Sequence, residues 1–135
     1  PRFAPCLPQL WAPSLLLVVG QRLIRKLCTE CKEAYELTKE ESRGLKLKSD
    51  LIYKAKGCGK CNQTGYRGRL SVAELMLINQ PMRDLVIQRV PFQKIRELAR
   101  LQGMQTLYES AIKKVEDGIT SLEEALATTL GEEYL

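Results

Sequence analysis

Four cysteines form two matched pairs, and they are the residues of this chain best suited to chemistry. The pairs are Cys28-x-x-Cys31 and Cys58-x-x-Cys61, separated by residues 32–57. Two thiolates at this spacing grip one ion, and two such pairs complete a tetrahedron, the geometry that Zn²⁺ favours with soft sulfur ligands. The pattern therefore predicts a metal site whose ligands are these four cysteines.

Other uses of the same thiols stay open at this point. We rank structural zinc first, rubredoxin-like iron or an iron–sulfur cluster second, and disulfides third, because nothing in the sequence marks the chain as secreted. A catalytic metal is not expected, since four thiolates leave no position for water and the chain has no histidine. The fifth cysteine, Cys6, lies in a proline-rich start and is expected to be a free thiol.

Composition indicates a globular chain of one domain or two small ones. The 135 residues are 44% hydrophobic and 27% charged. The formal net charge is +5, which a zinc ion with four thiolates would lower by about two. This mildly basic balance permits contact with nucleic acid but does not indicate it. The apolar run at 15–19 is too short to span a bilayer.

The elements that must position the cysteines indicate an α+β chain that is mainly helical. We expect a core-facing helix before the first pair and a small tetracysteine zinc subdomain with short strands around both pairs. A strand and a C-terminal bundle of about four helices should follow. The expected segments are an irregular proline-rich lead-in (1–13), the helix (14–27), the zinc-binding subdomain (28–69), and the strand with its helical bundle (70–135).

The helix expected over 14–27 depends on apolar spacing. Leu16, Val19, Leu23 and Leu27 follow one another at intervals of three or four residues, and basic residues gather toward the end. Cations in the last turn suit the helix dipole. This pattern predicts an amphipathic helix that leads directly into the first cysteine pair.

The C-terminal helices are predicted from their start signals. Thr106-x-x-Glu109 and Ser121-x-x-Glu124 are capping-box patterns, and Gly118 between them is a stop signal. The same reasoning places a short helix near 38–45, where Thr38 precedes Glu41 by three residues.

Acidic neighbours elsewhere are expected to be surface residues. Glu40–Glu41 and Glu123–Glu124 are assigned to the solvated surface, because both pairs lie at positions that are predicted to be exposed. We identify no catalytic residue and no cofactor-binding residue. The chain has no G-x-x-x-x-G-K-[ST] loop to bind phosphates and no histidine for base catalysis.

The loop Tyr66-Arg67-Gly68-Arg69 combines an aromatic residue with two arginines. Such a loop can stack on and clamp a nucleic acid. We favour the simpler interpretation, a turn whose tyrosine shields the second cysteine pair, because the net charge is modest.

Several short segments keep the order and spacing of one family's motifs. They are Gln21-Arg22-Leu23-Ile24-Arg25-Lys26-Leu27-Cys28-x-x-Cys31; Gly57-Cys58-x-x-Cys61-Asn62-x-Thr64-Gly65-Tyr66-x-Gly68-Arg69, followed by Glu74-Leu75; and Ile95-Arg96-Glu97-Leu98-Ala99, Gly103-Met104-x-Thr106-Leu107 and Gly118-Ile119-Thr120-Ser121-Leu122-Glu123-Glu124. In these stretches the chain resembles the C-terminal region of the secretion ATPases that assemble type II secretion systems and type IV pili.

The resemblance implies the tetracysteine zinc subdomain of the assembly-type motors, which the retraction-type pilus motors generally lack. It implies a hexameric ring ATPase, cytoplasmic and peripheral to the inner membrane. Its partners would be the membrane platform and the cytoplasmic components of the secretion or pilus machine. ATP and Mg²⁺ would be bound upstream in the parent protein, so only the four cysteines are carried over as site residues. This chain alone is expected to be inactive and to bind no small-molecule substrate.

Two alternatives to this function stay open. One is a free-standing zinc-ribbon protein that binds a protein partner, or nucleic acid through Arg67 and Arg69, although nucleic acid is not the favoured partner. The other is a remnant without a function of its own. Residues 1–13 depart from the family's pattern. The sequence does not decide between a fragment and a whole product, between type II secretion and type IV pili, or between zinc and iron.

Overall fold

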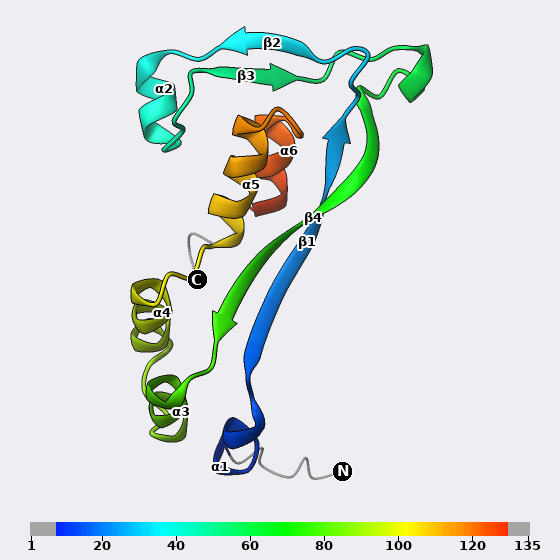
Figure 1. Ribbon diagram of the computed structural model, residues 1–135. Coiled ribbons are helices and arrows are strands. Elements are labelled where there is room, and N and C mark those ends of the chain that lie inside the picture. Colours follow the sequence, from blue (N-terminus) through cyan, green and yellow to red (C-terminus); the bar gives the residue numbers. More distant parts are fainter. Residues whose placement is uncertain (1–7, 130–135) are drawn as a thin grey trace. The chain divides into compact units, whose positions relative to one another are not determined.

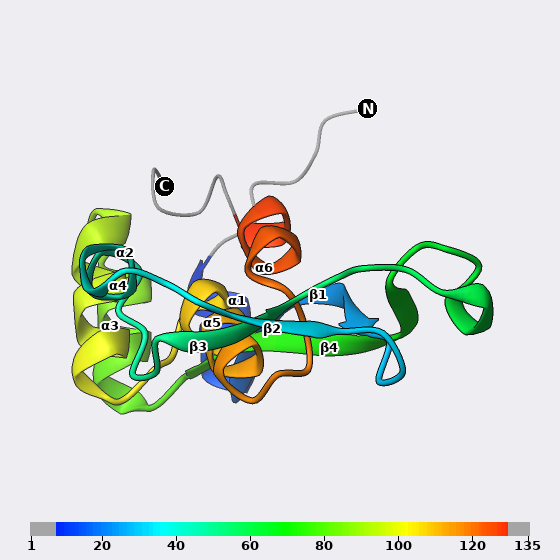
Figure 2. The same ribbon diagram turned by 90° about the horizontal axis from the view of Figure 1, so that it is seen from above.

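The computed structural model describes residues 8–129, which form two compact units (Figures 1 and 2). The first unit combines the described residues up to Gly20 with Glu74–Gln105, and we call it the α3–α4 unit. The second combines Gln21–Ala73 with the described residues from Thr106 onward, and we call it the cysteine unit. Each unit has its own buried core.

Strand β1 (Leu17–Leu27) lies where the sequence predicted a helix over 14–27, so that prediction is wrong. β1 pairs with β4 (Tyr66–Leu77), and their arrows point in opposite directions in Figure 1. Consecutive aliphatic residues at 17–19, two of them β-branched, favour an extended chain. The partner strand comes from a segment far along the sequence, which local apolar spacing does not reveal.

The stripe that was predicted to face the core is mostly exposed. Leu16, Val19 and Leu23 are exposed, whereas Ile24 is fully buried and Leu27 nearly so. Ile24 is outside the predicted stripe, and it is buried because it belongs to the core of the cysteine unit together with Ile52 and Val72.

The described part of the lead-in consists of two short turns. Helix α1 (Pro8–Trp11) has four residues, and a 3-10 turn, η1 (Ala12–Ser14), follows it directly. Prolines restrict this segment, so neither turn continues into a longer helix. Cys6, expected to be a free thiol, lies outside the described residues.

A small two-stranded sheet lies between the two cysteine pairs. Strand β2 (Glu33–Glu36) runs antiparallel to β3 (Leu51–Lys54), with Glu33 opposite Lys54. Helix α2 (Lys39–Gly44) connects the strands, and its capping box between Thr38 and Glu41 confirms the predicted helix start. These short strands are the ones expected in the tetracysteine region.

Helices α5 (Leu107–Glu116) and α6 (Leu122–Thr129) pack against each other and against β3. The capping box at the start of α5 is present as predicted: Thr106 Oγ1 accepts from Glu109 N at 3.2 Å, and Glu109 Oε2 accepts from Thr106 N at 3.0 Å. The core of the cysteine unit is enclosed by α5, α6, β3 and those parts of β1 and β4 that belong to this unit. Its buried members are Ile24, Ile52, Val72, Leu107, Ala111, Val115 and Ala125.

Helices α3 (Gln80–Ile87) and α4 (Phe92–Leu101) pack together in the other unit. Asn79 caps α3 by accepting a hydrogen bond from Met82 N at 3.2 Å. The buried core here is smaller, and consists of Ile78, Met82 and Ala99 with partly buried aliphatic and methionine side chains around them.

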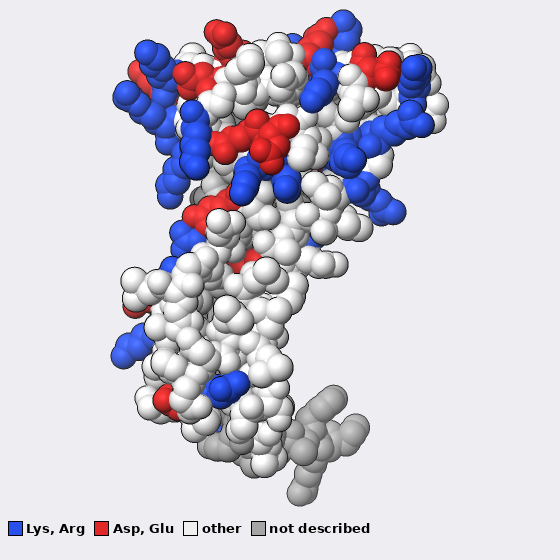
Figure 3. Space-filling view, viewed as in Figure 1, with Lys and Arg blue, Asp and Glu red and all other residues white. Residues whose placement is uncertain are grey.

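The expected α+β class with four C-terminal helices is confirmed. Among the described residues, no helix is both long enough and apolar enough to cross a bilayer. Charged side chains of both signs gather over the cysteine unit, whereas the visible face of the α3–α4 unit carries few (Figure 3). The intermingled signs in this view do not form a large basic surface.

Candidate metal centre

The first cysteine pair follows the end of β1. Cys28 is the residue after Leu27, and the chain then turns so that Cys28 O accepts from Cys31 N at 3.3 Å and from Lys32 N at 3.0 Å. This tight turn, which we call the first knuckle, brings the two thiols of the pair to one side of the chain. β1 therefore fixes the position of the first ligand.

The second cysteine pair forms a similar turn around η2 (Gly59–Cys61), which we call the second knuckle. Cys58 O accepts from Cys61 N at 3.2 Å and from Gln63 N at 2.9 Å. Gly65 closes the turn with φ of +76°, and a Cβ atom there would lie only 2.6 Å from the Cβ of Ala55. Glycine is required at this position both by backbone conformation and by space.

The four predicted ligands come together in the structure. All four Sγ atoms lie within 4.8 Å of one another, although their knuckles are far apart in sequence. The Sγ–Sγ separations are 3.9 Å for Cys28–Cys58, 3.8 Å for Cys31–Cys61 and 3.7 Å for Cys58–Cys61. Zn–S bonds of about 2.3 Å in a tetrahedron place sulfur atoms about 3.8 Å apart. The residues therefore fit a tetrahedral thiolate-bound ion.

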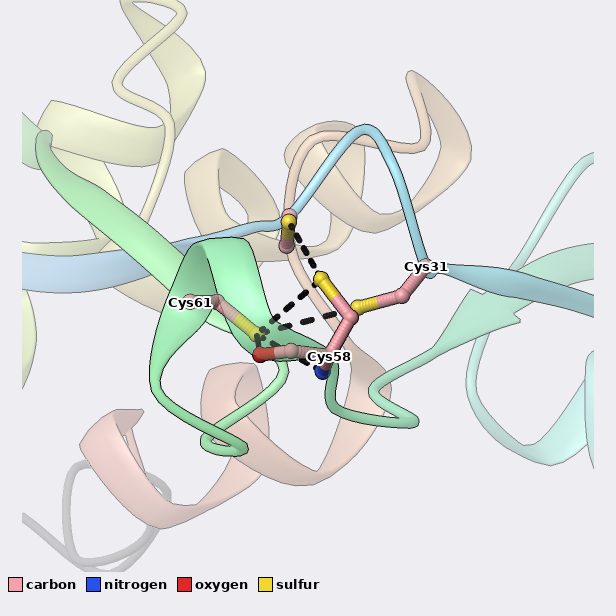
Figure 4. Close-up of side chains that lie close together, drawn as sticks. Cys31, Cys58 and Cys61 are labelled. Atoms are coloured by element: carbon pink, nitrogen blue, oxygen red, sulfur yellow. Dashed lines mark hydrogen bonds between the residues drawn. The ribbon is translucent and has the colours of Figure 1, made fainter.

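Figure 4 shows the thiols of Cys31, Cys58 and Cys61 converging on a common centre. These described cysteines, with Cys28, are free thiols rather than disulfides. Their separations are far beyond the S–S bond length of about 2.05 Å. The arrangement thus favours metal binding over the disulfide alternative.

Backbone groups prepare the site for negative charge. Cys58 N and Gly65 N each donate to Cys61 Sγ at 3.2 Å. Burial raises the pKa of the Cys61 thiol, but these hydrogen bonds and those from neighbouring thiols outweigh burial and bring the pKa to about 6. Burial is the main cause that raises the pKa of Cys31 to about 12. The two backbone N–H groups therefore stabilise a thiolate at Cys61.

The donor set determines what this site can do. Four sulfur ligands would complete the coordination of a tetrahedral ion and leave no position for water or substrate. Such a site stabilises a fold and does not activate a nucleophile. Zinc and iron both accept four thiolates, so the geometry alone is compatible with either ion.

Two ion pairs connect the first knuckle and the start of β2 with the second knuckle and the residues before it. Lys60 Nζ lies 3.4 Å from Glu30 Oε2, and Lys56 pairs with Glu33. The Lys56 ammonium holds the pKa of the Glu33 carboxyl below its usual range. These side chains are more than a third exposed, so each pair contributes little to stability.

Sequence reasoning missed a buried polar cluster beside the knuckles. Glu124, expected on the solvated surface, is only 8% exposed, and its carboxylate accepts from Arg25 Nε at 2.9 Å. Ser121-x-x-Glu124 was recognised as a helix start, and Ser121 Oγ does accept from Glu124 N at 3.2 Å. The Glu124 carboxylate, however, bonds Arg25 instead of completing the capping box. No local signal could identify this partner, which lies 99 residues away.

Tyr66 makes contacts within the cysteine unit. Its hydroxyl lies 2.7 Å from Ser121 Oγ, and the Arg25 guanidinium lies 4.2 Å from the centre of its ring. These contacts connect Tyr66 to Arg25 and Ser121, and the guanidinium covers one face of the ring.

Comparisons with known proteins identify the family of this chain. Residues 7–127 match the family described as "Type II/IV secretion system protein". The chain is 41% identical over 125 residues to the "Type II secretion system ATPase E" of Vibrio cholerae, covering 90% of this chain and 25% of that protein. It is 36% identical to the "Type IV pilus assembly ATPase PilB" of Thermus thermophilus, covering 87% of this chain and 14% of that protein.

A third relative is the "Type II secretion system protein HxcR" of Pseudomonas aeruginosa, at 41% identity over 90% of this chain and 23% of that protein. The chain thus spans about a quarter or less of the length of these relatives. The match extends over both cysteine pairs, over α3, α4 and α5, and over most of α6. The chain belongs to the type II/IV secretion system protein family.

Proposed function

We propose that this chain is the C-terminal, zinc-bearing part of an ATPase that drives assembly in type II secretion or in type IV pilus formation. The observation that carries the proposal is the convergence of four thiols in a segment that matches the family over residues 7–127. The names of the relatives support the ATPase part of the proposal. The cluster of four cysteines supports a structural role for the metal.

ATP hydrolysis would belong to the longer protein. This sequence has no G-x-x-x-x-G-K-[ST] loop, so ATP and Mg²⁺ would be bound by segments that the relatives have and this chain lacks. In that protein the chain would take part in a hexameric ring at the cytoplasmic side of the inner membrane. Its partners would be the membrane platform and the other cytoplasmic components of the machine.

Exposed apolar residues on β1, on β4 and directly before β1 support a place in a longer protein. Leu16 and Leu77 are 72% and 66% exposed, and the neighbouring aliphatic residues at 17–19 are exposed as well. An isolated pair of strands is only marginally stable, and a contiguous apolar surface usually contacts something. We infer that further strands or helices of the parent protein cover these residues.

Metal analysis tests the zinc part of the proposal. The full chain, purified without added metal, should contain one equivalent of zinc and show no visible absorption. One equivalent of iron with a coloured thiolate spectrum would instead identify a rubredoxin-like centre. Loss of the metal in a Cys58→Ser variant would connect it to the cluster.

The native gene tests the ATPase part. An in-frame upstream segment that encodes a G-x-x-x-x-G-K-[ST] loop, and an intact protein several times longer than 135 residues, would support the proposal. A natural polypeptide with a mass close to that of these 135 residues would contradict it. The free-standing zinc-ribbon alternative, with a protein or nucleic-acid partner, would then be the better hypothesis.

A further inference from the structure

The turn between α5 and α6 concentrates buried polar residues. Thr120 is fully buried and Ser121 is 3% exposed, and both lie in the segment 118–121, which we call the α5–α6 turn. Buried polar groups need hydrogen-bond partners. The partners of this turn come from the two knuckles and from the strands that lead into them.

The first knuckle is held on both of its sides. Leu27, the residue before Cys28, donates from its backbone N to Ile119 O at 2.8 Å. Lys32, the residue after Cys31, donates from Nζ to Gly118 O at 2.8 Å. The two ends of the first knuckle therefore bond neighbouring carbonyls of the same turn.

The second knuckle reaches the same turn through Tyr66, whose hydroxyl lies 2.7 Å from Ser121 Oγ. Tyr66 directly follows Gly65, whose N–H bonds Cys61 Sγ and whose carbonyl accepts from Cys28 N at 2.9 Å. The hydrogen bond between Tyr66 and Ser121 thus fixes Tyr66, and Tyr66 is adjacent to Gly65, which contacts both knuckles.

An ion pair and a cation–π contact reinforce the arrangement. Arg25 donates from Nη2 and from its backbone N to the Glu124 carboxylate at 2.6 and 2.9 Å. Arg25 O accepts from Thr120 Oγ1 at 2.8 Å, and Lys32 Nζ lies 4.3 Å from the centre of the Tyr53 ring. All of these contacts lie within the cysteine unit.

We propose that the α5–α6 turn is the platform that holds the two knuckles at the separation the metal requires. Lys32, Tyr66 and Ser121 are then positioning residues for the metal, although none of them is a ligand. A preorganised thiolate set releases its ion more slowly, because an opened knuckle recloses before the ion escapes. The proposal rests on metal binding by the cysteines and is independent of the ATPase assignment.

The cleanest test compares Tyr66→Phe with Tyr108→Phe in the zinc-loaded full chain. Each variant loses one hydroxyl in the cysteine unit, but the Tyr108 hydroxyl donates to Leu45 O at 3.2 Å, at the end of α2. The measurement is the rate at which Zn²⁺ passes to a chromophoric chelator. Tyr66→Phe should release zinc roughly fivefold faster, as expected for one lost hydrogen bond, and Tyr108→Phe at close to the wild-type rate.

A double-mutant cycle and a cobalt spectrum make the test specific. Ser121→Ala should also accelerate release, and the double variant should be little faster than Ser121→Ala alone, because both changes remove the same bond. The Co²⁺-substituted Tyr66→Phe variant should keep a tetrahedral tetrathiolate spectrum, since its ligands are unchanged. Zinc release from Tyr66→Phe at the control rate would overturn the proposal.

Global stability must be measured alongside the release rate. If Tyr66→Phe and Tyr108→Phe destabilise the fold equally and accelerate release equally, the turn has no particular role and the proposal fails. If the wild-type chain binds one zinc but Tyr66→Phe releases zinc at the wild-type rate, only this inference fails, and the proposal of a zinc-bearing domain is unaffected. If wild type holds no metal, both the inference and the zinc assignment fail.

Discussion

The two units of the molecule cover their apolar residues to very different extents. Among the described residues, the large hydrophobic side chains that are exposed in the cysteine unit are Leu23 and Leu51 alone. The α3–α4 unit exposes a longer set: Leu10, Trp11, Leu16, Leu17, Val18, Val19, Leu75, Leu77, Phe92 and Leu101. The smaller unit thus has the larger exposed apolar surface.

The polar contacts show the same contrast. The cysteine unit ties its segments together through Arg25, Glu124 and the α5–α6 turn, and four thiols converge inside it. In the α3–α4 unit, Arg83 donates to Leu15 O at 3.0 Å, but its buried Nε has no hydrogen-bond partner among residues 8–129. The cysteine unit thus covers nearly all of its large apolar side chains and joins its segments by polar contacts, whereas the α3–α4 unit leaves many large apolar side chains exposed.

Metal removal should produce the largest effect and should act on one unit only. Structural zinc sites contribute on the order of 10 kcal/mol of apparent binding free energy to folding. We expect Cys58→Ser, or chelation of the metal, to abolish amide protection in the cysteine unit, including α5 and α6. Helices α3 and α4 should keep their protection. Hydrogen exchange followed by mass spectrometry measures both units in one experiment.

A matched control for this prediction is Cys6→Ser, which removes a thiol outside the predicted ligand set. That variant should bind metal and exchange as wild type does. Equal loss of protection in both units of Cys58→Ser would break the comparison, because the α3–α4 unit would then depend on the metal centre.

Removing the buried carboxylate should have the next largest effect. Glu124→Gln loses the charge that Arg25 contacts, and charge-assisted hydrogen bonds contribute about 1.5–3 kcal/mol. We expect a loss of about 2 kcal/mol in the free energy of unfolding, measured with denaturant on the zinc-loaded chain. Asp117→Asn is the control, because its partner Lys114 is 3.9 Å away and the carboxylate is exposed. That change should cost less than about 0.5 kcal/mol.

The pH dependence of this penalty follows from the pKa of Glu124. Hydrogen bonding and charge from Arg25 hold that pKa below its usual range. A lowered folded-state pKa means that the contribution is present above the unfolded-state pKa and is lost as pH falls through the folded-state value. The penalty should therefore be constant from about pH 7.5 to about pH 5.5. A penalty that shrinks within this range would contradict the assigned pairing.

Gly118→Ala should have a smaller effect on the same unit. Gly118 has φ of +65°, and a Cβ atom there would lie 2.9 Å from the Tyr53 ring and 3.3 Å from Lys32 Nζ. The left-handed conformation alone costs a non-glycine residue about 1–2 kcal/mol. We expect a loss near the upper end of this range in unfolding free energy, because the Tyr53 ring must also shift. Gly44→Ala at the end of α2 is the control, because its Cβ would meet no atom within 4 Å.

Local signals in the sequence predicted what local contacts determine. The capping boxes of Thr38 and Thr106 form between residues three apart, and both are present. The cysteine cluster was predictable despite its distant pairs, because the C-x-x-C spacing reports a shared ion rather than a neighbouring element.

The errors concern long-range partners. β1 resembled a helix because its apolar spacing fits a helical period; its β-branched residues favour an extended chain, but the pairing with β4 that completes the strand is long-range. Glu124 resembled a surface residue because Arg25, which stabilises it in the interior, is 99 residues away. In both cases the deciding interaction is tertiary, and the sequence near the residue contains no trace of it.

The smallest stability effect, and the sharpest probe of the α3–α4 unit, should come from charges on its exposed strand residues. Leu75 and Leu77 project from the same face of β4 and are 52% and 66% exposed. In this chain, Leu75→Lys with Leu77→Lys should change the unfolding free energy by no more than about 0.5 kcal/mol per substitution. The same changes should reduce self-association and the binding of an apolar dye, because they remove exposed apolar surface.

The control lies between these two residues. Met76 packs against the core of Ile78, Met82 and Ala99, so Met76→Lys should destabilise the unit by several times more. In the longer parent protein, the Leu75 and Leu77 substitutions should become strongly destabilising, since a covered surface would then receive two buried charges. A mild effect in the parent as well would mean that this face stays open there, and its apolar character would then need a different partner.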